Sequence, residues 1–256
     1  MHNTSENSFL RWQEVWDRKG AVAAAQLESG EVTALDLSEL LAIDGYDTAA
    51  SQIGTANWLT YVETIGSRLG LGEGEGKSEL CEIGCGAGAF SQPLYQQGVQ
   101  ITGADYSAGL ISICKVIMPK GRFEVAEACA VPFESATFDA VISGSVFIYF
   151  PTLEYAELAF AEIVRLMKPG GRAALLDLND NARKQEYESI KMEKLGRAEY
   201  ERMYKDHRHL FYDRAWIMGL AHKHNLQCVI EDQILAGYPN AAFRFNVFLN
   251  FLPDAG

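Results

Sequence analysis

The chain has 256 residues, of which 48% are hydrophobic and 22% are charged. These proportions are ordinary for a globular protein with its own core, so they exclude intrinsic disorder over most of the chain. The 23 glycines follow no period, which excludes a fibrous protein. No segment approaches the ~18 uninterrupted apolar residues that a membrane-spanning helix needs.

Acidic residues outnumber basic ones, 34 to 22, so the formal net charge is −12. This excess repels nucleic-acid phosphates and anionic lipids, and we expect neither nucleic acid nor a membrane as a partner. The first residues show no basic segment followed by an apolar run, so we expect no secretory signal. The five cysteines lack both CxxC spacing and the density of a disulfide scaffold, which favours a cytoplasmic protein with free thiols.

The first 70 residues predict helices. Phe9, Trp12 and Trp16 recur at near-helical spacing, and apolar residues between 58 and 69 mark a clear amphipathic helix. A glycine-rich segment over 70–76 ends that helix as a hinge. We therefore predict a helical N-terminal cap over residues 1–70 and a second domain over residues 71–256.

Strands and helices alternate after the hinge. Short apolar stretches predict strands near 78–83, 99–104, 122–126, 138–143 and 172–178. Because helical segments separate most of them, parallel pairing through right-handed crossovers is expected. Two final strands flank Gly237-Tyr-Pro-Asn, which predicts a hairpin. The expected fold class is α/β: a doubly wound, mostly parallel seven-stranded sheet with a C-terminal antiparallel hairpin, a helical N-terminal cap and a helical insert over 181–212 after the fifth strand.

The sharpest local signal is the segment Glu82-Ile-Gly-Cys-Gly-Ala-Gly88, which follows a strand and opens a helix. Glycines allow a tight turn and the close approach of a ligand. Asp105 ends the next strand, where a carboxylate can accept hydrogen bonds from the hydroxyls of a ribose. The glycines alone also satisfy a dinucleotide-binding pattern, so they do not decide which adenosine-type cofactor binds.

Four further motifs follow in order, and with the glycine turn they make the chain resemble class I S-adenosylmethionine-dependent methyltransferases of the small-molecule type. They are Gly103-Ala-Asp-Tyr-Ser107, Glu127-Ala-Cys-Ala-Val-Pro-Phe133, Phe138-Asp-Ala-Val-Ile-Ser143 and Leu166-Met-Lys-Pro-Gly-Gly171. The resemblance covers 78–178 in detail and implies S-adenosylmethionine as the cofactor. Charge agrees with it, because carboxylates near the turn favour a cationic ligand and would repel the phosphates of a dinucleotide.

The resemblance also implies roles for particular residues. Gly84, Gly86 and Gly88 would form the turn under the methionine part of the cofactor, and Glu82 would lie beneath it. Asp105 would hold the ribose.

The adenine is expected next to Tyr106, which would pack on it, and to the backbone at Ala128. Glu127 stands where the family more often has Asp. Ser143 would line the passage to the methyl group, while Tyr46 and Trp16 of the cap would cover the cofactor and shape the acceptor pocket, unless they only pack between helices.

Three residues are candidates for catalysis. Tyr149 follows the fourth strand, Asp177 ends the fifth, and His209 lies at the end of the insert. Each also has a structural interpretation: Tyr149 as a core aromatic, Asp177 as a helix cap or solvated carboxylate, and His209 as a packed side chain. No metal site is expected, since the His-x-His pairs at 207 and 222 would diverge by about 200° on a helix.

We therefore expect an enzyme that transfers a methyl group, by in-line displacement, to an oxygen or nitrogen nucleophile of a small metabolite such as a biosynthetic intermediate. Two alternatives stay open: a catalytically silent cofactor-binding scaffold or partner subunit, and a methyltransferase whose substrate is bound to a carrier. Basic residues of the insert such as Arg183, Lys184 and Lys191 would dock that carrier. The oligomeric state is not predicted.

Overall fold

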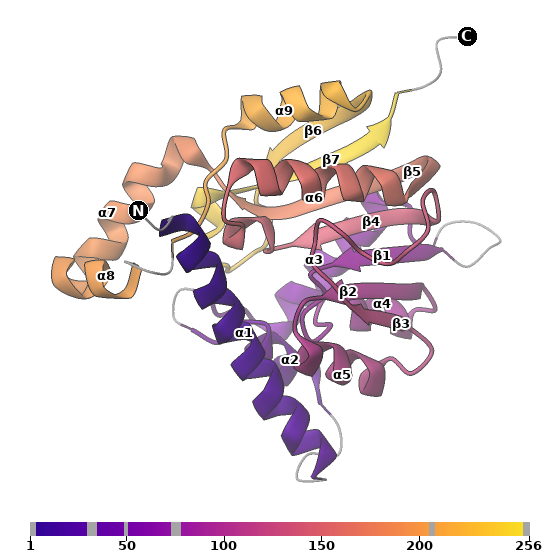
Figure 1. Ribbon diagram of the computed structural model, residues 1–256, viewed down its shortest axis with the longest axis horizontal. Helices are drawn as coiled ribbons and strands as arrows, with labels where there is room; N and C mark the ends of the chain where they lie inside the picture. Colours follow the sequence, from indigo (N-terminus) through magenta and orange to yellow (C-terminus); the bar gives the residue numbers. More distant parts are fainter. Residues whose placement is uncertain (1–3, 30–34, 49–50, 73–77, 205–207, 253–256) are drawn as a thin grey trace.

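The computed structural model describes residues 4–29, 35–48, 51–72, 78–204 and 208–252. One seven-stranded sheet forms its centre (Figure 1), in the order β3-β2-β1-β4-β5-β7-β6. The strands are β1 (Glu79–Ile83), β2 (Gln100–Asp105), β3 (Arg122–Val125), β4 (Phe138–Gly144), β5 (Met167–Asn179), β6 (Leu226–Asp232) and β7 (Arg244–Phe251). Strands β1 to β5 pair in parallel, whereas β7 runs antiparallel to both β5 and β6. The predicted fold class is confirmed, including the C-terminal antiparallel hairpin.

Helices cover both faces of the sheet. They are α1 (Thr4–Glu28), α2 (Leu37–Ile43), α3 (Thr55–Arg68), α4 (Ser91–Gln96), α5 (Ala108–Ile117), α6 (Leu153–Leu166), α7 (Lys184–Leu195), α8 (Arg197–Tyr204) and α9 (Arg214–Lys223). Successive strand residues point to opposite faces, so Leu80 packs in one cluster with α2 to α5 and Cys81 in another with α6 and α9. None of the helices in the described ranges is long and apolar enough to cross a membrane.

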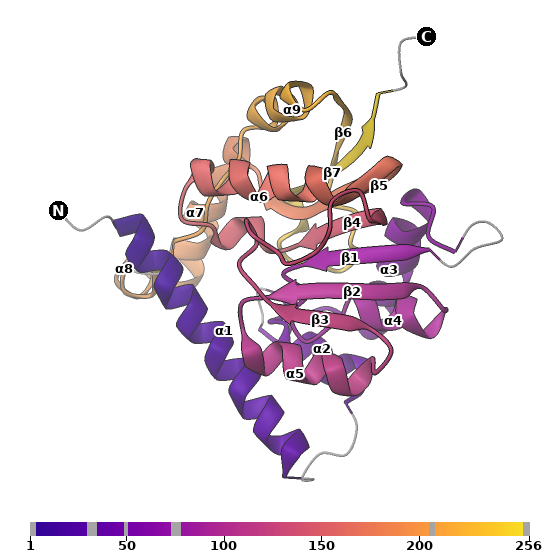
Figure 2. The same ribbon diagram turned by 45° about the vertical axis from the view of Figure 1, so that its right-hand side comes forward.

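The predicted cap does not form a separate layer throughout. Side chains of α3, among them Trp58 and Ile65, share a buried cluster with Leu80 and Ile101 of the sheet. Helix α1 instead crosses the start of α5 and extends past the ends of the strands (Figure 2). The boundary at residue 70 therefore stays a prediction.

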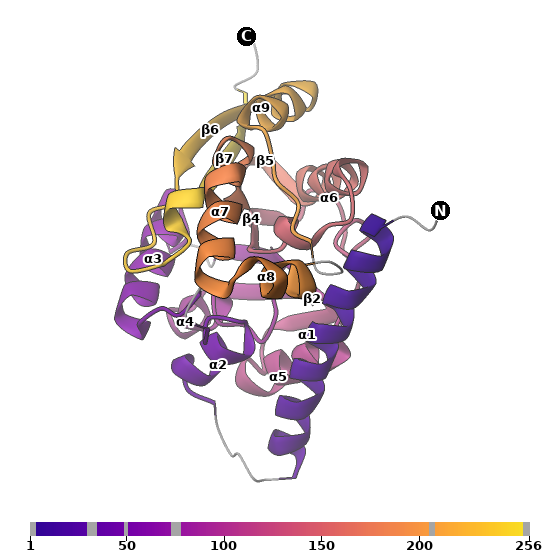
Figure 3. The same cartoon turned by 90° about the vertical axis from the view of Figure 1, so that its left-hand side faces the viewer.

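The insert lies at the carboxyl ends of the strands (Figure 3), where α7 and α8 face the N-terminal half of α1. A short 3-10 turn (Asn181–Arg183) opens it, and α9 follows it. Much of its charge pairs within the helices: Arg197 contacts Glu201, and Arg202 contacts Glu199. Such pairs within one helix are typical of a solvent-exposed helix surface.

The crossing of α1 and α5 depends on two glycines in close contact. A Cβ atom on Gly109 would lie 2.5 Å from the carbonyl carbon of Gly20 and 2.7 Å from the backbone nitrogen of Ala21. The two backbones therefore touch without side chains between them. This contact fixes α1 against the sheet domain, so that Trp12 and Trp16 reach the carboxyl ends of the strands.

Substitution of Gly109 tests this crossing. We expect Gly109→Ala to lower the free energy of unfolding by about 1–3 kcal/mol, because overpacking forces the helix backbones apart. The matched control is Gly219→Ala on α9, where a Cβ atom meets nothing within 4 Å. Because alanine favours a helix, that variant should be unchanged or more stable by up to about 1 kcal/mol. Chemical denaturation of the two variants compares them, and equal stabilities would contradict the close crossing.

Candidate active site

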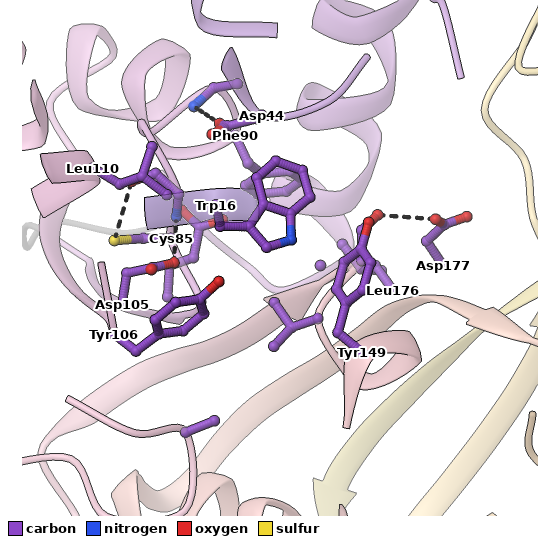
Figure 4. Close-up of a pocket in the computed structure, with 18 of the residues that line it drawn as sticks. Trp16, Asp44, Cys85, Phe90, Asp105, Tyr106, Leu110, Tyr149, Leu176 and Asp177 are labelled. Carbon is purple, nitrogen blue, oxygen red and sulfur yellow. Dashed lines mark hydrogen bonds between the residues drawn. The ribbon is translucent and has the colours of Figure 1, made fainter. Parts of the chain in front are cut away.

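A cavity opens at the carboxyl ends of β1, β2, β4 and β5, below α1 (Figure 4). Its walls are mainly aromatic and acidic. The acidic side chains are those of Asp44, Glu82, Asp105, Glu127 and Asp177. No lysine, arginine or histidine of the described chain lines it. The lining therefore favours a neutral or cationic ligand over an anion.

The turn after β1 follows its glycines. Gly84 and Gly86 both have positive φ angles, of 74° and 54°, which side chains rarely tolerate. A Cβ atom on Gly86 would lie 2.4 Å from Oδ1 of Asp44, inside the cavity wall. Gly88 also has a positive φ, but the space at its Cβ is filled by Met118, which directly follows α5. Gly88 thus supports the turn from behind and does not line the cavity.

Asp105 lies directly beside this turn because β2 pairs in parallel with β1. Its carboxylate accepts the backbone N–H groups of Gly86 and Ser107, each at 3.0 Å. The side chain is 7% exposed, and burial raises the pKa of Asp105 to about 6. A carboxylate has about four lone-pair sites, and the two backbone N–H groups use two of them. Two sites remain for a ligand, which is the number that the predicted contact with two ribose hydroxyls requires.

Asp44 is a residue of the site that the sequence did not reveal. It follows α2, and its carboxylate accepts the backbone N–H groups of Ala87 at 2.6 Å and of Ala89 at 3.1 Å. Burial is the main reason that the pKa of Asp44 rises to about 7, and the charge of Asp105 adds to it. No local motif signals this role, because it depends on how α2 packs against the glycine turn.

Glu82 completes a group of three carboxyl groups around the turn. It is 4% exposed at the end of β1 and accepts a hydrogen bond from the Ser91 hydroxyl. The pKa of Glu82 is raised to about 8, mainly by burial and in smaller part by the charges of Asp44 and Asp105. Three buried acids that repel one another make this end of the cavity favourable for positive charge.

The residues predicted near adenine lie together at this same end. Tyr106, Glu127 and Ala128 all line the cavity. The Glu127 carboxylate accepts hydrogen bonds from Tyr155 Oη at 2.7 Å and from Gln13 Nε2 at 3.1 Å, so side chains of this chain already hold it.

Trp16 lies between two ends of the cavity (Figure 4). Asp105 and Tyr106 are on one side of it, and Tyr149 and Asp177 are on the other. The ring of Trp16 packs edge-on against Tyr149, with 5.6 Å between the ring centroids.

The far end contains two of the three predicted catalytic residues and Tyr46. Tyr149 and Asp177 line the cavity, and Tyr46 reaches this end through a hydrogen bond of 2.8 Å to Ser145. Ser145 in turn donates to Asp177 Oδ2 at 2.9 Å. Ser145 was not predicted, although it stands in the segment after the fourth strand that the sequence singled out.

Besides Gly88, two predicted residues do not line the cavity. Ser143 is 1% exposed inside β4, and its hydroxyl has no hydrogen-bond partner within the described ranges. The chain reaches the cavity two residues later, where Ser145 has a positive φ of 57°. His209 stacks on Trp12, with a centroid distance of 4.9 Å and an interplanar angle of 13°. Its ring lies behind Trp12 and Tyr149, which agrees with the packed interpretation.

Among the described residues, no group of three or more His, Cys, Asp or Glu side chains is arranged to hold a metal ion. His207, one member of a His-x-His pair, lies outside the described residues.

Comparisons with known proteins concern the same region. The model of a family described as a methyltransferase domain matches residues 81–175, which contain the glycine turn and Asp105. The mouse (Mus musculus) tRNA (carboxymethyluridine(34)-5-O)-methyltransferase ALKBH8 is 29% identical over 169 residues, which cover 64% of this chain and 24% of that protein. Demethylmenaquinone methyltransferase of Streptomyces griseus is 26% identical over 101 residues, covering 40% of this chain and 43% of that one. The matches thus span less than half the length of these relatives.

A solved structure matches over most of the chain. It is magnesium protoporphyrin IX methyltransferase from Synechocystis PCC 6803 with bound SAH, at a TM-score of 0.59 and 15% identity. The match covers 91% of this chain and all of that one. At this identity the likeness establishes the fold.

The three buried carboxyl groups predict how stability depends on pH. Their pKa values of about 6, 7 and 8 exceed those of unfolded acids, so the folded state binds more protons between about pH 4 and 8. Their contribution to stability therefore falls as the pH rises through this window. We expect Asp44→Asn to remove part of this fall, so that at pH 8 its melting temperature exceeds that of the wild type by about 3 °C or more.

Thermal melts between pH 5 and 8 test this expectation. At pH 5 the wild type and Asp44→Asn should melt close together, because the carboxyl group is then protonated. Glu63→Gln, at an exposed position on α3, is the matched control and should keep the slope of the wild type. A parallel slope for Asp44→Asn would show that Asp44 is not the group responsible.

Proposed function

The chain carries a class I methyltransferase domain of the S-adenosylmethionine-dependent type, and from this premise we propose that it methylates an oxygen or nitrogen nucleophile of a small metabolite. The observation that carries the proposal is the position of Asp105 beside the glycine turn, in a cavity lined by five acids and by no basic residue of the described chain. When bound, S-adenosylmethionine supplies a methyl group on a positively charged sulfur, already activated for displacement.

The residues present fit this cofactor. Gly84 and Gly86 line the cavity with backbone alone and take the positive φ angles of the turn, which allows the close approach of a ligand. Asp105 retains lone pairs for two ribose hydroxyls, and Tyr106 offers a ring to adenine. A sulfonium or ammonium group bound near Asp44 and Glu82 would favour their ionised forms, because a nearby positive charge lowers the pKa of a carboxyl group. A pyrophosphate would meet the same carboxyl groups and be repelled, which disfavours a dinucleotide.

The chain's part in the reaction is to hold the acceptor and exclude water. The nucleophile must lie ~3 Å from the methyl carbon, opposite the sulfur. Tyr149 and Asp177 line the end of the cavity beyond Trp16, where an acceptor would be bound. Aromatic side chains of α1, those of Phe9, Trp12 and Trp16, line the cavity and would help to exclude water from a bound acceptor. A general base is needed only for a nucleophile that must lose a proton of high pKa, so Asp177 and Tyr149 serve first to orient the acceptor.

We also propose a role in small-molecule biosynthesis and a place in the cytoplasm. All five cysteines are free thiols, and the structure shows three of them buried and two partly buried. Thiols that form no disulfide are usual in a reducing compartment.

Binding of the cofactor tests the proposal. We expect S-adenosylmethionine to bind with a micromolar dissociation constant and Asp105→Ala to weaken it at least about tenfold, because two hydrogen bonds to the ribose are lost. Calorimetric titration measures both values. The matched control is Asp139→Ala, since Asp139 lies on β4 outside the cavity and pairs with Lys168. A wild type that binds no S-adenosylmethionine would refute the proposal.

The similarity to a tRNA methyltransferase keeps tRNA as an alternative acceptor, so the expected absence of nucleic acid stays a prediction. The net charge of −12 disfavours a polyanion. Transfer of a labelled methyl group to bulk tRNA and to a low-molecular-weight metabolite extract, side by side, separates the two acceptors. A carrier-bound substrate would label a protein fraction, and its labelling would weaken in an Arg183→Glu variant. A chain that binds the cofactor and labels none of these would be the silent scaffold.

A further inference from the structure

Two residues with unusual backbone conformations meet at the acceptor end of the cavity. Ser145 after β4 and Asp177 in β5 have positive φ angles of 57° and 64°, a region that side chains other than those of Asn and Asp seldom adopt. The pairing of β5 with β7 shifts register at the same place, between Leu175 and Leu178. Such strain costs on the order of 1–3 kcal/mol per residue and collects at functional sites. Here both strained residues line the cavity and bond to each other.

Hydrogen-bond donors surround the carboxyl group of Asp177. Ser145 Oγ donates to Oδ2 at 2.9 Å, Tyr238 Oη to Oδ2 at 3.1 Å, and Gln233 Nε2 to Oδ1 at 3.2 Å. The guanidinium of Arg244, itself 3% exposed, lies 3.9 Å away. These contacts suit a carboxylate, which only accepts, and they hold it rigidly at 4% exposure.

The hydrogen bonds of Tyr46 and Ser145 have one direction, from donor to acceptor toward Asp177. Ser145 has a single hydroxyl proton, which it gives to Asp177, so the 2.8 Å contact with Tyr46 requires the Tyr46 hydroxyl to be the donor. Burial and the charge of Asp177 hold the pKa of Tyr46 well above its usual value, so that proton is present. Once it is given to Ser145, the Tyr46 oxygen has only lone pairs to offer to the cavity. The relay Tyr46–Ser145–Asp177 therefore accepts hydrogen bonds from a ligand and donates none.

The surroundings of the relay favour positive charge. The ring of Tyr46 packs against Trp58 with 4.7 Å between the centroids, and Trp16 and Tyr149 complete an aromatic wall. Aromatic faces attract a cation within about 6 Å of the ring. Arg244 does not line the cavity, so its charge supports Asp177 from behind and is not offered to a ligand.

We propose that the relay Tyr46–Ser145–Asp177 and its aromatic wall form an acceptor subsite that recognises the protonated amino group of the substrate. An ammonium group brings up to three N–H donors to the lone pairs that remain on the oxygens of Tyr46 and Asp177. A carboxylate or phosphate at the same place would offer only hydrogen-bond acceptors to the acceptors of the relay. Its negative charge would also be repelled by that of Asp177. The inference rests on the proposed function and narrows its acceptor to amine-bearing metabolites.

Matched amines and acids test the subsite. The protein is first saturated with S-adenosylhomocysteine, which fills the cofactor end without turnover. It is then titrated with two pairs that differ only in the head group: 2-phenylethylamine with 3-phenylpropionate, and pentylamine with hexanoate. We expect at least one amine to bind saturably and about tenfold or more tighter than its acid, as one charge contact of about 1.4 kcal/mol requires.

Two variants assign the preference to the relay. Asp177→Asn should reduce the preference for the amine at least about fivefold. Tyr46→Phe keeps the ring but removes the accepting oxygen, so it should weaken the amine about three- to tenfold while leaving S-adenosylhomocysteine within about twofold. If Asp177→Asn fails to fold, the amine affinity of Tyr46→Phe still tests whether the relay binds the amino group. Glu134→Gln, at an exposed position outside the cavity, is the control and should bind both ligands like the wild type.

The outcomes separate this inference from the proposed function. Acids that bind as tightly as their amines, no binding by either amine, or unchanged amine binding in Tyr46→Phe would each overturn the subsite while cofactor binding persists. A protein that binds neither S-adenosylmethionine nor S-adenosylhomocysteine would instead refute the proposed function.

Discussion

The site depends on three carboxyl groups buried around one glycine turn. Asp44, Glu82 and Asp105 come from three separate segments, and each receives donors from the chain that offset part of the cost of burial. The rest of that cost appears as pKa values raised to between about 6 and 8. A positively charged ligand lowers it further, whereas an anion increases it. The buried carboxyl groups around the turn therefore favour a positively charged ligand over a negatively charged one, whatever other contacts the ligand makes.

The N-terminal helices link this turn to the acceptor end. Asp44 bonds to the glycine turn, and Tyr46, two residues later, bonds to Ser145 beside Asp177. Gly45 between them has a φ of 89°, and a Cβ atom there would lie 2.6 Å from the Trp16 ring. Because the glycine crossing fixes α1 on α5, Trp16 holds this short segment against the sheet. One three-residue segment thus couples both ends of the cavity, and a shift of α1 would disturb them together.

Features with a local cause could be predicted from the sequence. The alternation of strands and helices predicted the fold, and the glycine spacing placed the turn beside Asp105, as parallel pairing requires. Features that depend on packing could not be predicted. Asp44 acquires its partners only when α2 docks, and Ser145 replaces Ser143 at the cavity because its backbone is left-handed. For His209, only the position of Trp12 shows that the ring is stacked away from the cavity.

The limits of the similarity to known proteins also have a structural meaning. The family match covers residues 81–175 and contains Glu82, Gly84, Gly86 and Asp105, which lie at the cofactor end. It stops two residues before Asp177. Of the other polar groups at that end, Ser145 and Tyr149 lie within the match, whereas Tyr46, Gln233, Tyr238 and Arg244 come from segments outside it. The family match therefore covers the glycine turn and Asp105 but only part of the other end of the cavity. A methyl acceptor has to be inferred from the relay Tyr46–Ser145–Asp177, whose hydrogen bonds all point toward Asp177.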